Sequence, residues 1–183
     1  MATATRSRTY DMVYIGVFAV LMTICSWISI PTVIPVTLQT FAVFLAVAVL
    51  GGKRGTMAVV VYVLLGVVGI PVFSGFTGGI GMLMGNTGGY ILGFIFSTLV
   101  IWAIEKLFGR KTWIMAVSMV LGLAVCYLFG TIWFMVVYAK SAGAIGFTTV
   151  LSWCVLPFIV PDLVKIGLAL VVSRRLSRAV GIS

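Results

Sequence analysis

The chain has 183 residues, of which 62% are hydrophobic and only 8% are charged. Soluble domains usually carry about a quarter charged residues, so the composition excludes a soluble globular protein. The formal net charge is +9. Lys and Arg stand in short clusters between apolar runs, which favours loops that face anionic lipid headgroups in a bilayer and argues against a nucleic-acid-binding protein.

The three longest runs without a charged residue are at positions 12–52, 55–104 and 112–139. Each exceeds the roughly 20 apolar residues that span a bilayer, and the first two are long enough to cross twice. We therefore predict an all-α integral membrane protein that forms a single polytopic domain, residues 1–183. The first apolar run is too long for a signal peptide and is expected to remain as a helix.

Breaker residues divide these runs into six predicted transmembrane helices. The motif "PTVIP" ends the first, "GGKRG" ends the second and Pro71 ends the third, while "FGRK" separates the fourth from the fifth. A glycine-rich segment precedes the fourth helix and a mixed segment precedes the sixth. The predicted bundle has helices at about 12–30, 36–50, 56–70, 86–107, 112–138 and 161–176.

An even number of crossings places both termini on one side of the membrane. Ten of the twelve Lys and Arg residues then share that side, and only Lys140 and Lys165 lie on the other. This bias predicts cytoplasmic termini in a multi-pass protein of the plasma membrane. Three Gly- and Pro-rich segments form the outer face. Because irregular backbone at membrane depth lies over protein or lines a cavity, they predict an outward-facing pocket.

Catalytic and metal-binding motifs are missing from the sequence. It has no histidine, three acidic residues, no GxSxG motif and no Walker A loop, so we expect neither an enzyme nor ATP hydrolysis by this chain. Cys25, Cys126 and Cys154 stand alone in apolar contexts without a CxxC pair, which indicates inert buried thiols rather than a zinc site. We expect no cofactor.

One pair of opposite charges lies inside an apolar run, in "LPFIVPDLVKIG" at residues 156–167. Asp162 and Lys165 are three positions apart and share a helix face. They could form a local pair, with Asp162 favoured by the dipole at the helix N-terminus. Charges inside a membrane segment nevertheless predict a functional site by default, so we expect both to face the pocket and bind a polar solute.

Two further stretches offer polar groups on the same outer side. In "GNTGGY", Asn86 provides an amide that donates and accepts, and Tyr90 follows one turn later. Glycines recur there every four residues, from position 81 to position 93, which fits either close helix packing or close approach of a ligand. In "IPVTLQTF", Gln39 is a third candidate, although the neighbouring threonines are explained equally well by helix capping.

The sequence resembles the biotin-specific substrate-binding (S) components of energy-coupling-factor (ECF) vitamin transporters. The stretches that carry the resemblance occur in family order along nearly the whole chain: "IPVTLQTFAVFLAVAVLGGKRG", "VYVLLGVVGIPVFSG", "GNTGGYILGF", "FGTIWF" and "PFIVPDLVKIGLA". The resemblance implies a six-helix bundle that binds biotin from outside, with Asn86, Tyr90, Asp162 and Lys165 at the binding site. It also implies a transmembrane coupling subunit and two ABC ATPases as partners.

The chemistry of biotin fits these residues. Its ureido ring presents two N–H donors and one carbonyl acceptor, which suit Asp162 and Asn86, and its carboxylate suits Lys165. Lys165 could instead only orient Asp162. The alternative function is a stand-alone secondary carrier for biotin or another small carboxylated solute, with Asp162 as a proton or cation site. The lack of an evident inverted repeat argues against that carrier.

Overall fold

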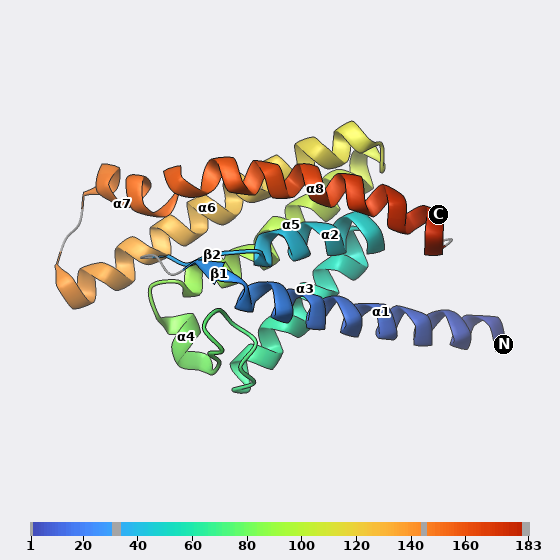
Figure 1. Cartoon of the computed structure of the whole chain (residues 1–183), viewed down its shortest axis with the longest axis horizontal. Coiled ribbons are helices and arrows are strands. Elements are labelled where there is room, and N and C mark those ends of the chain that lie inside the picture. The colour runs from blue at the N-terminus through green and yellow to red at the C-terminus, as the bar shows by residue number, and fades with distance from the viewer. Residues whose placement is uncertain (1, 31–33, 144–145, 181–183) are drawn as a thin grey trace.

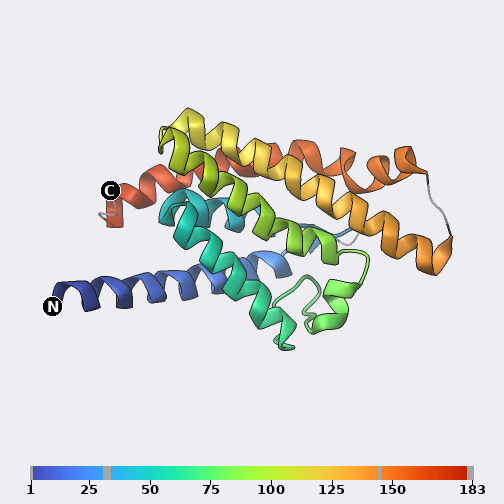
Figure 2. The same cartoon turned by 180° about the vertical axis from the view of Figure 1, so that it is seen from behind.

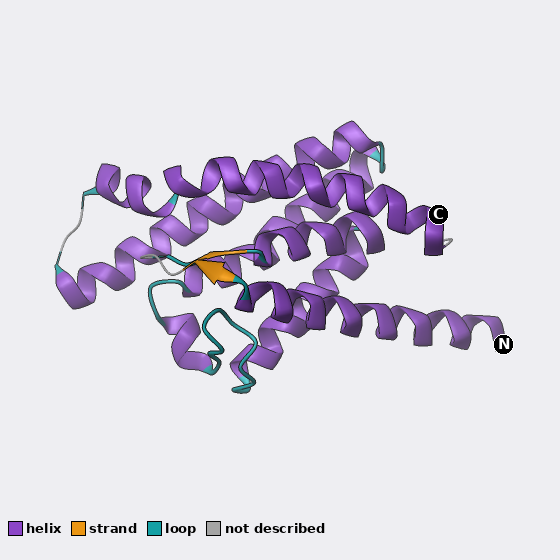
Figure 3. Ribbon diagram, in the orientation of Figure 1, coloured by secondary structure: helices purple, strands orange, loops and turns teal. Residues whose placement is uncertain are grey.

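The computed structural model describes residues 2–30, 34–143 and 146–180, and the side chains of 8–30, 34–140, 143 and 146–176. The described chain is a bundle of helices with one two-stranded hairpin (Figures 1 and 3). The prediction of an all-α membrane protein is confirmed. In chain order the elements are α1 (Ala2–Trp27), β1 (Ser29–Ile30), β2 (Val36–Thr37), α2 (Gln39–Leu50), α3 (Gly52–Val67), α4 (Ile80–Met84), α5 (Gly88–Phe108), α6 (Thr112–Ala142), α7 (Phe147–Cys154) and α8 (Leu156–Val180).

Four stretches of the described residues are helical, long and apolar enough to cross a membrane. These stretches are Arg8–Trp27, Gly88–Phe108, Thr112–Lys140 and Phe147–Leu176. Their exposed side chains are largely apolar, as a surface in contact with lipid requires. The expected multi-pass membrane protein is therefore confirmed.

Helix α2 is the centre of the bundle. Eleven of its 12 residues are buried, which explains why the sequence of this helix is hydrophobic on every side. It contacts α1, α3, α5 and α8. From behind, α3 and α5 lie in front of it (Figure 2). A 12-residue helix is short for a bilayer, and the neighbouring helices shield it because nearly all of its residues are buried.

Several helix boundaries differ from the sequence prediction. Helix α1 ends at Trp27, because residues 29 and 30 pair with residues 37 and 36 in an antiparallel hairpin. Helix α8 begins at Leu156 rather than Pro161 and carries that proline in its interior. The glycine-rich and mixed segments contain the short helices α4 and α7. In α7, Val150 and Cys154 are four residues apart and both buried, so a helical face packs against the bundle.

The glycines of α5 are explained by helix packing where they face α6. A methyl group on Gly89 would lie 2.2 Å from Cβ of Trp133, and one on Gly93 would lie 2.9 Å from Sγ of Cys126. The same test finds no atom within 4 Å at Gly81. Helix packing therefore explains Gly89 and Gly93 and does not explain Gly81.

A polar clasp holds the corner between α2 and α3. The carboxylate of Glu105 in α5 accepts from the backbone N–H of Gly52 and pairs with Arg110, whose Nε lies 3.3 Å from Oε1. Arg110 also donates to the carbonyl of Ala48, at 2.7 Å. Gly51 turns the corner with φ of 85°, which a residue with Cβ rarely adopts. The clasp thus satisfies backbone groups at two adjoining helix ends.

Candidate binding site

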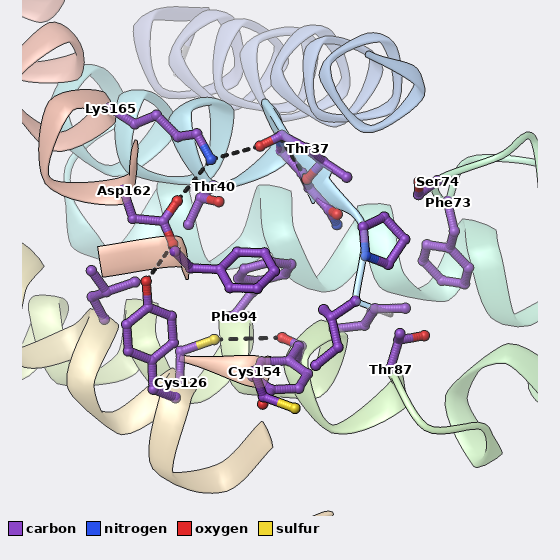
Figure 4. Close-up of a pocket in the computed structure, with 18 of the residues that line it drawn as sticks. Thr37, Thr40, Phe73, Ser74, Thr87, Phe94, Cys126, Cys154, Asp162 and Lys165 are labelled. Carbon is purple, nitrogen blue, oxygen red and sulfur yellow. Dashed lines mark hydrogen bonds and ion pairs between the residues drawn. The ribbon is translucent and has the colours of Figure 1, made fainter. Parts of the chain in front are cut away.

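A cavity lies between the β1–β2 hairpin and α2 on one side and α5, α6 and α8 on the other (Figure 4). Its volume is about 110 Å³. A single water needs roughly 10–15 Å³, so the cavity has room for a small ligand. Hydrophobic and aromatic side chains form most of its wall, and a few polar groups converge on it, as in typical ligand sites. The aromatic walls are Phe73, Tyr90, Phe94, Tyr127 and Phe158.

Asp162 and Lys165 both line this cavity. Nζ of Lys165 donates to Oδ1 of Asp162 at 2.7 Å and to the backbone carbonyl of Thr37 at 2.7 Å. Oδ2 of Asp162 accepts from the hydroxyl of Tyr127 at 2.6 Å. Figure 4 shows Lys165 reaching from α8 across to the hairpin while Asp162 turns towards α6.

The pair is deeply buried, with 2% of Asp162 and 6% of Lys165 exposed. Burial of two charges carries a large desolvation cost unless further hydrogen bonds satisfy them. Tyr127 and the carbonyl of Thr37 supply those bonds. Asp162 is the seventh residue of α8, beyond the first turn, so the helix dipole does not account for its position.

The pair leaves specific capacity for a ligand. An ammonium group has three donors, and two of those of Lys165 have partners in the described chain. A carboxylate has about four acceptor sites, and Asp162 fills one on each oxygen. Lys165 is the one cation among the described residues of the cavity wall. The site can therefore accept from and donate to a polar guest while the pair itself is neutral.

Tyr127 is a site residue that the sequence analysis did not single out. The signal available was a tyrosine in the middle of an apolar helix, because a buried hydroxyl usually needs a partner. That partner, Asp162, is 35 residues away in the sequence. No local spacing connects the two.

The other candidate residues have different positions. Tyr90 lines the cavity, and its hydroxyl lies 3.3 Å from that of Thr131. Gln39 also lines it and donates from Nε2 to the hydroxyl of Tyr62 at 2.9 Å. Asn86 is half-buried and is not among the lining residues, whereas its neighbour Thr87 is. The structure thus brings Tyr90, Gln39, Asp162 and Lys165 together in one cavity.

The three cysteines are free and buried, as their apolar contexts predicted. Cys126 and Cys154 lie in the cavity wall, and Sγ of Cys126 contacts the carbonyl of Tyr90 at 3.6 Å. Within the described part of the chain no cluster of His, Cys, Asp and Glu residues could hold a metal ion.

Known proteins similar to this chain cover almost all of it. The profile of the BioY family matches residues 1–182. A biotin transporter, BioY, of Thermotoga maritima is 40% identical over 171 residues, which are 92% of this chain and 96% of that protein. A probable biotin transporter, BioY, of Pyrococcus horikoshii is 39% identical over 170 residues, 92% of this chain and 97% of that protein.

A solved structure has the same fold. It is the crystal structure of the S-component for biotin from an ECF-type ABC transporter, and it is 25% identical in sequence. The TM-score is 0.83, with 94% of this chain and 93% of that chain covered. The resemblance carried by the sequence motifs is confirmed, and the chain belongs to the BioY family.

Proposed function

We propose that the protein is the biotin-binding membrane subunit of an ECF-type ABC importer. The observation that carries the proposal is the buried Asp162–Lys165 pair in the wall of a cavity, in a chain whose relatives are named as biotin transporters. The family is one of transporters, so the protein is not an enzyme, as the absence of catalytic motifs predicted.

Biotin matches the groups that the cavity offers. A free acceptor site on Asp162 suits a ureido N–H, and the third donor of Lys165 suits a hydrogen-bond acceptor. Aromatic side chains such as Phe94 and Phe158 give the bicyclic ring an apolar wall. Tyr90 and Gln39 remain proposed contacts. Asn86, outside the wall, is a proposed contact that requires its side chain to turn towards the ligand.

The neutrality of the pair bears on which end of biotin it holds. Lys165 is already paired with Asp162, so a second carboxylate beside them would add an uncompensated buried charge, which is costly. The uncharged ureido ring adds none. We therefore propose that the ureido ring, rather than the carboxylate, lies at Asp162 and Lys165, in place of the sequence-based assignment of Lys165 to the carboxylate.

Biotinamide, which lacks the negative charge, tests this orientation. If the ureido ring meets the pair, biotin and biotinamide bind the parent protein with similar affinity, and Lys165→Gln weakens both alike. If Lys165 holds the carboxylate, biotinamide loses the roughly 10–150-fold that a charged hydrogen bond contributes. Isothermal titration of the purified chain measures both ligands.

The distribution of charge supports an outward-facing pocket. Helix α1 begins and helix α8 ends at one end of the bundle, beside the α2–α3 and α5–α6 connections (Figure 1). Nearly all Lys and Arg residues belong to those four regions. The hairpin, α4 and α7 lie towards the opposite end (Figure 1). We propose six crossings, by α1, α2, α3, α5, α6 and α8, with both termini cytoplasmic and the cavity near the outer face.

Partner subunits follow from the same proposal. The chain has no Walker A motif, so ATP-driven uptake needs a transmembrane coupling subunit and two ABC ATPases from elsewhere. The family that the sequence resembles often has an Ala-xxx-Ala pair on the first helix that docks the coupling subunit. This chain departs from that pattern, because α1 offers Gly16, Ala19 and Thr23 instead. Ala19 and Thr23 are buried within the chain's own core. Gly16 has open space around it, so it is the small residue of the three available to a partner.

A thermal-shift series against water-soluble vitamins tests the ligand. Biotin at 100 times its dissociation constant should stabilise the protein by about 2.7 kcal/mol, or roughly 5–11 °C for a chain of this size. Asp162→Asn should abolish most of that shift. A shift with another vitamin and none with biotin would contradict the proposal. Uptake that needs the ATPases supports the importer, and uptake by this chain alone that an uncoupler abolishes supports the secondary carrier.

A further inference from the structure

A second cavity lies at the corner between α2 and α3, near the end of α5 and away from the cavity described above. Its volume is about 400 Å³. The wall is formed by the backbone of the corner together with Trp102, Glu105 and four cationic side chains. Those cations are Lys53, Arg54, Lys106 and Arg110.

Two of the four cations are already paired. Nε of Arg110 lies 3.3 Å from Oε1 of Glu105, and its terminal nitrogen donates to Ala48. Arg54 lies 3.0 Å from the carboxylate of Asp11 in α1. The second oxygen of Glu105 accepts from the N–H of Gly52. The single negative charge of Glu105 is balanced by Arg110, so it does not offset the charge of a further cation.

Lys53 and Lys106 are the two cations left over. Both are exposed at the rim of the cavity, one from the start of α3 and one from the end of α5. The salt bridges of the described residues do not include either of them. Two cationic side chains without a salt-bridge partner in the described chain, from separate helices in the wall of one cavity, attract an anion.

Apolar side chains next to the cavity indicate the kind of anion. Leu50 and Trp102 form part of its wall. Leu107, Phe108 and Trp113 follow in the α5–α6 region and are 75%, 65% and 65% exposed. Exposed apolar side chains beside basic ones are typical of the membrane interface, where lipid phosphates lie. We propose that Lys53 and Lys106 bind a phosphate group in this cavity, presented by an anionic lipid headgroup or by free phosphate.

Lipid binding to the purified full chain, measured by native mass spectrometry, tests the proposal. The probes are phosphatidylglycerol, which has a net negative headgroup, and phosphatidylcholine, which carries the same phosphodiester with a compensating cation. Each lysine near a lipid surface contributes roughly fivefold to affinity, so K53Q/K106Q should weaken phosphatidylglycerol binding by about 30-fold. R174Q/R175Q removes equal charge from α8, whose two arginines do not line this cavity, and should weaken phosphatidylglycerol binding much less.

Inorganic phosphate distinguishes the two sources. If millimolar phosphate displaces the lipid from the parent protein but not from K53Q/K106Q, the site also takes free phosphate. If phosphate does not displace the lipid from the parent protein, the lipid headgroup is the ligand. Equal losses in the two double variants, or equal binding of the two lipids by the parent, would overturn the proposal. Both lysines are exposed, so unchanged unfolding temperatures are expected and show that the variants fold.

Discussion

Removal of one charge from the buried pair is expected to cost more stability than removal of both. In Asp162→Asn, Lys165 keeps its charge but loses the carboxylate 2.7 Å away, and Tyr127 loses a charged acceptor. The two side chains of the pair are only 8% and 4% exposed, so solvent cannot take over the lost interaction. Loss of one partner from such a pair typically costs about 3–5 kcal/mol.

The double variant Asp162→Asn/Lys165→Gln removes both charges while keeping similar side-chain shapes. Replacement of a whole buried pair is often close to neutral, so we expect it to recover at least half of the lost stability. For a chain of this size the single variant should unfold about 6–20 °C below the parent, and the double variant much closer to it.

Thermal unfolding in one mild detergent, without ligand, measures the three proteins side by side. The second single variant, Lys165→Gln, completes a double-mutant cycle. It should be as unstable as Asp162→Asn, since it leaves the carboxylate of Asp162 without its cation. If the double variant instead loses the sum of the two single losses, and so unfolds below either single variant, Asp162 and Lys165 do not stabilise each other. That result would refute a mutually stabilising ion pair at the site, independently of any result with biotin.

Three further predictions concern groups outside the ion pair. Tyr127→Phe removes a hydrogen bond to a buried carboxylate and should lower the free energy of unfolding by about 1.5–3 kcal/mol, measured by denaturant titration. Glu105→Leu leaves the N–H of Gly52 without its acceptor and should cost about 1–3 kcal/mol in the same assay; no change would show that the clasp is not needed. Gly89→Ala brings a methyl group to 2.2 Å from Trp133 and should cost about 1–3 kcal/mol. Gly81→Ala, which has open space, is its matched control and should be neutral.

Local sequence patterns account for much of the fold. The charge-free runs and the breakers between them place the main helices, because spans and helix ends leave signals within a few residues of one another. Helices α4 and α7 were missed because five and eight residues are too few to show a clear periodicity. The start of α8 was placed at Pro161, since a proline usually marks a helix boundary.

The site was predictable where its parts are close in sequence. The spacing of three between Asp162 and Lys165 predicts their contact on one helix face. The hydrogen-bond partners that offset the burial of these charges are distant in sequence. Tyr127 is 35 residues from Asp162, and Thr37, whose carbonyl accepts from Lys165, is 128 residues from Lys165. A backbone carbonyl has no sequence signature of its own, and the β1–β2 hairpin that presents it has only two residues in each strand. Tertiary structure alone brings these groups together.

Asp162 and Lys165 keep hydrogen-bonding capacity that no residue of the described chain uses, and this capacity lets the site discriminate between ligands. Asp162 and Lys165 are held in place by bonds that do not depend on a guest, so the groups left over point in fixed directions before binding. A ligand that supplies both an N–H and a carbonyl completes their hydrogen bonding. A ligand that lacks either leaves a buried polar group unpaired, and sites of this kind reject such analogues far more strongly than hydrophobic pockets reject a change in size. Selectivity for a ureido ring would therefore come from the fixed polar groups, while the aromatic wall contributes affinity through its contact with the rest of the ligand.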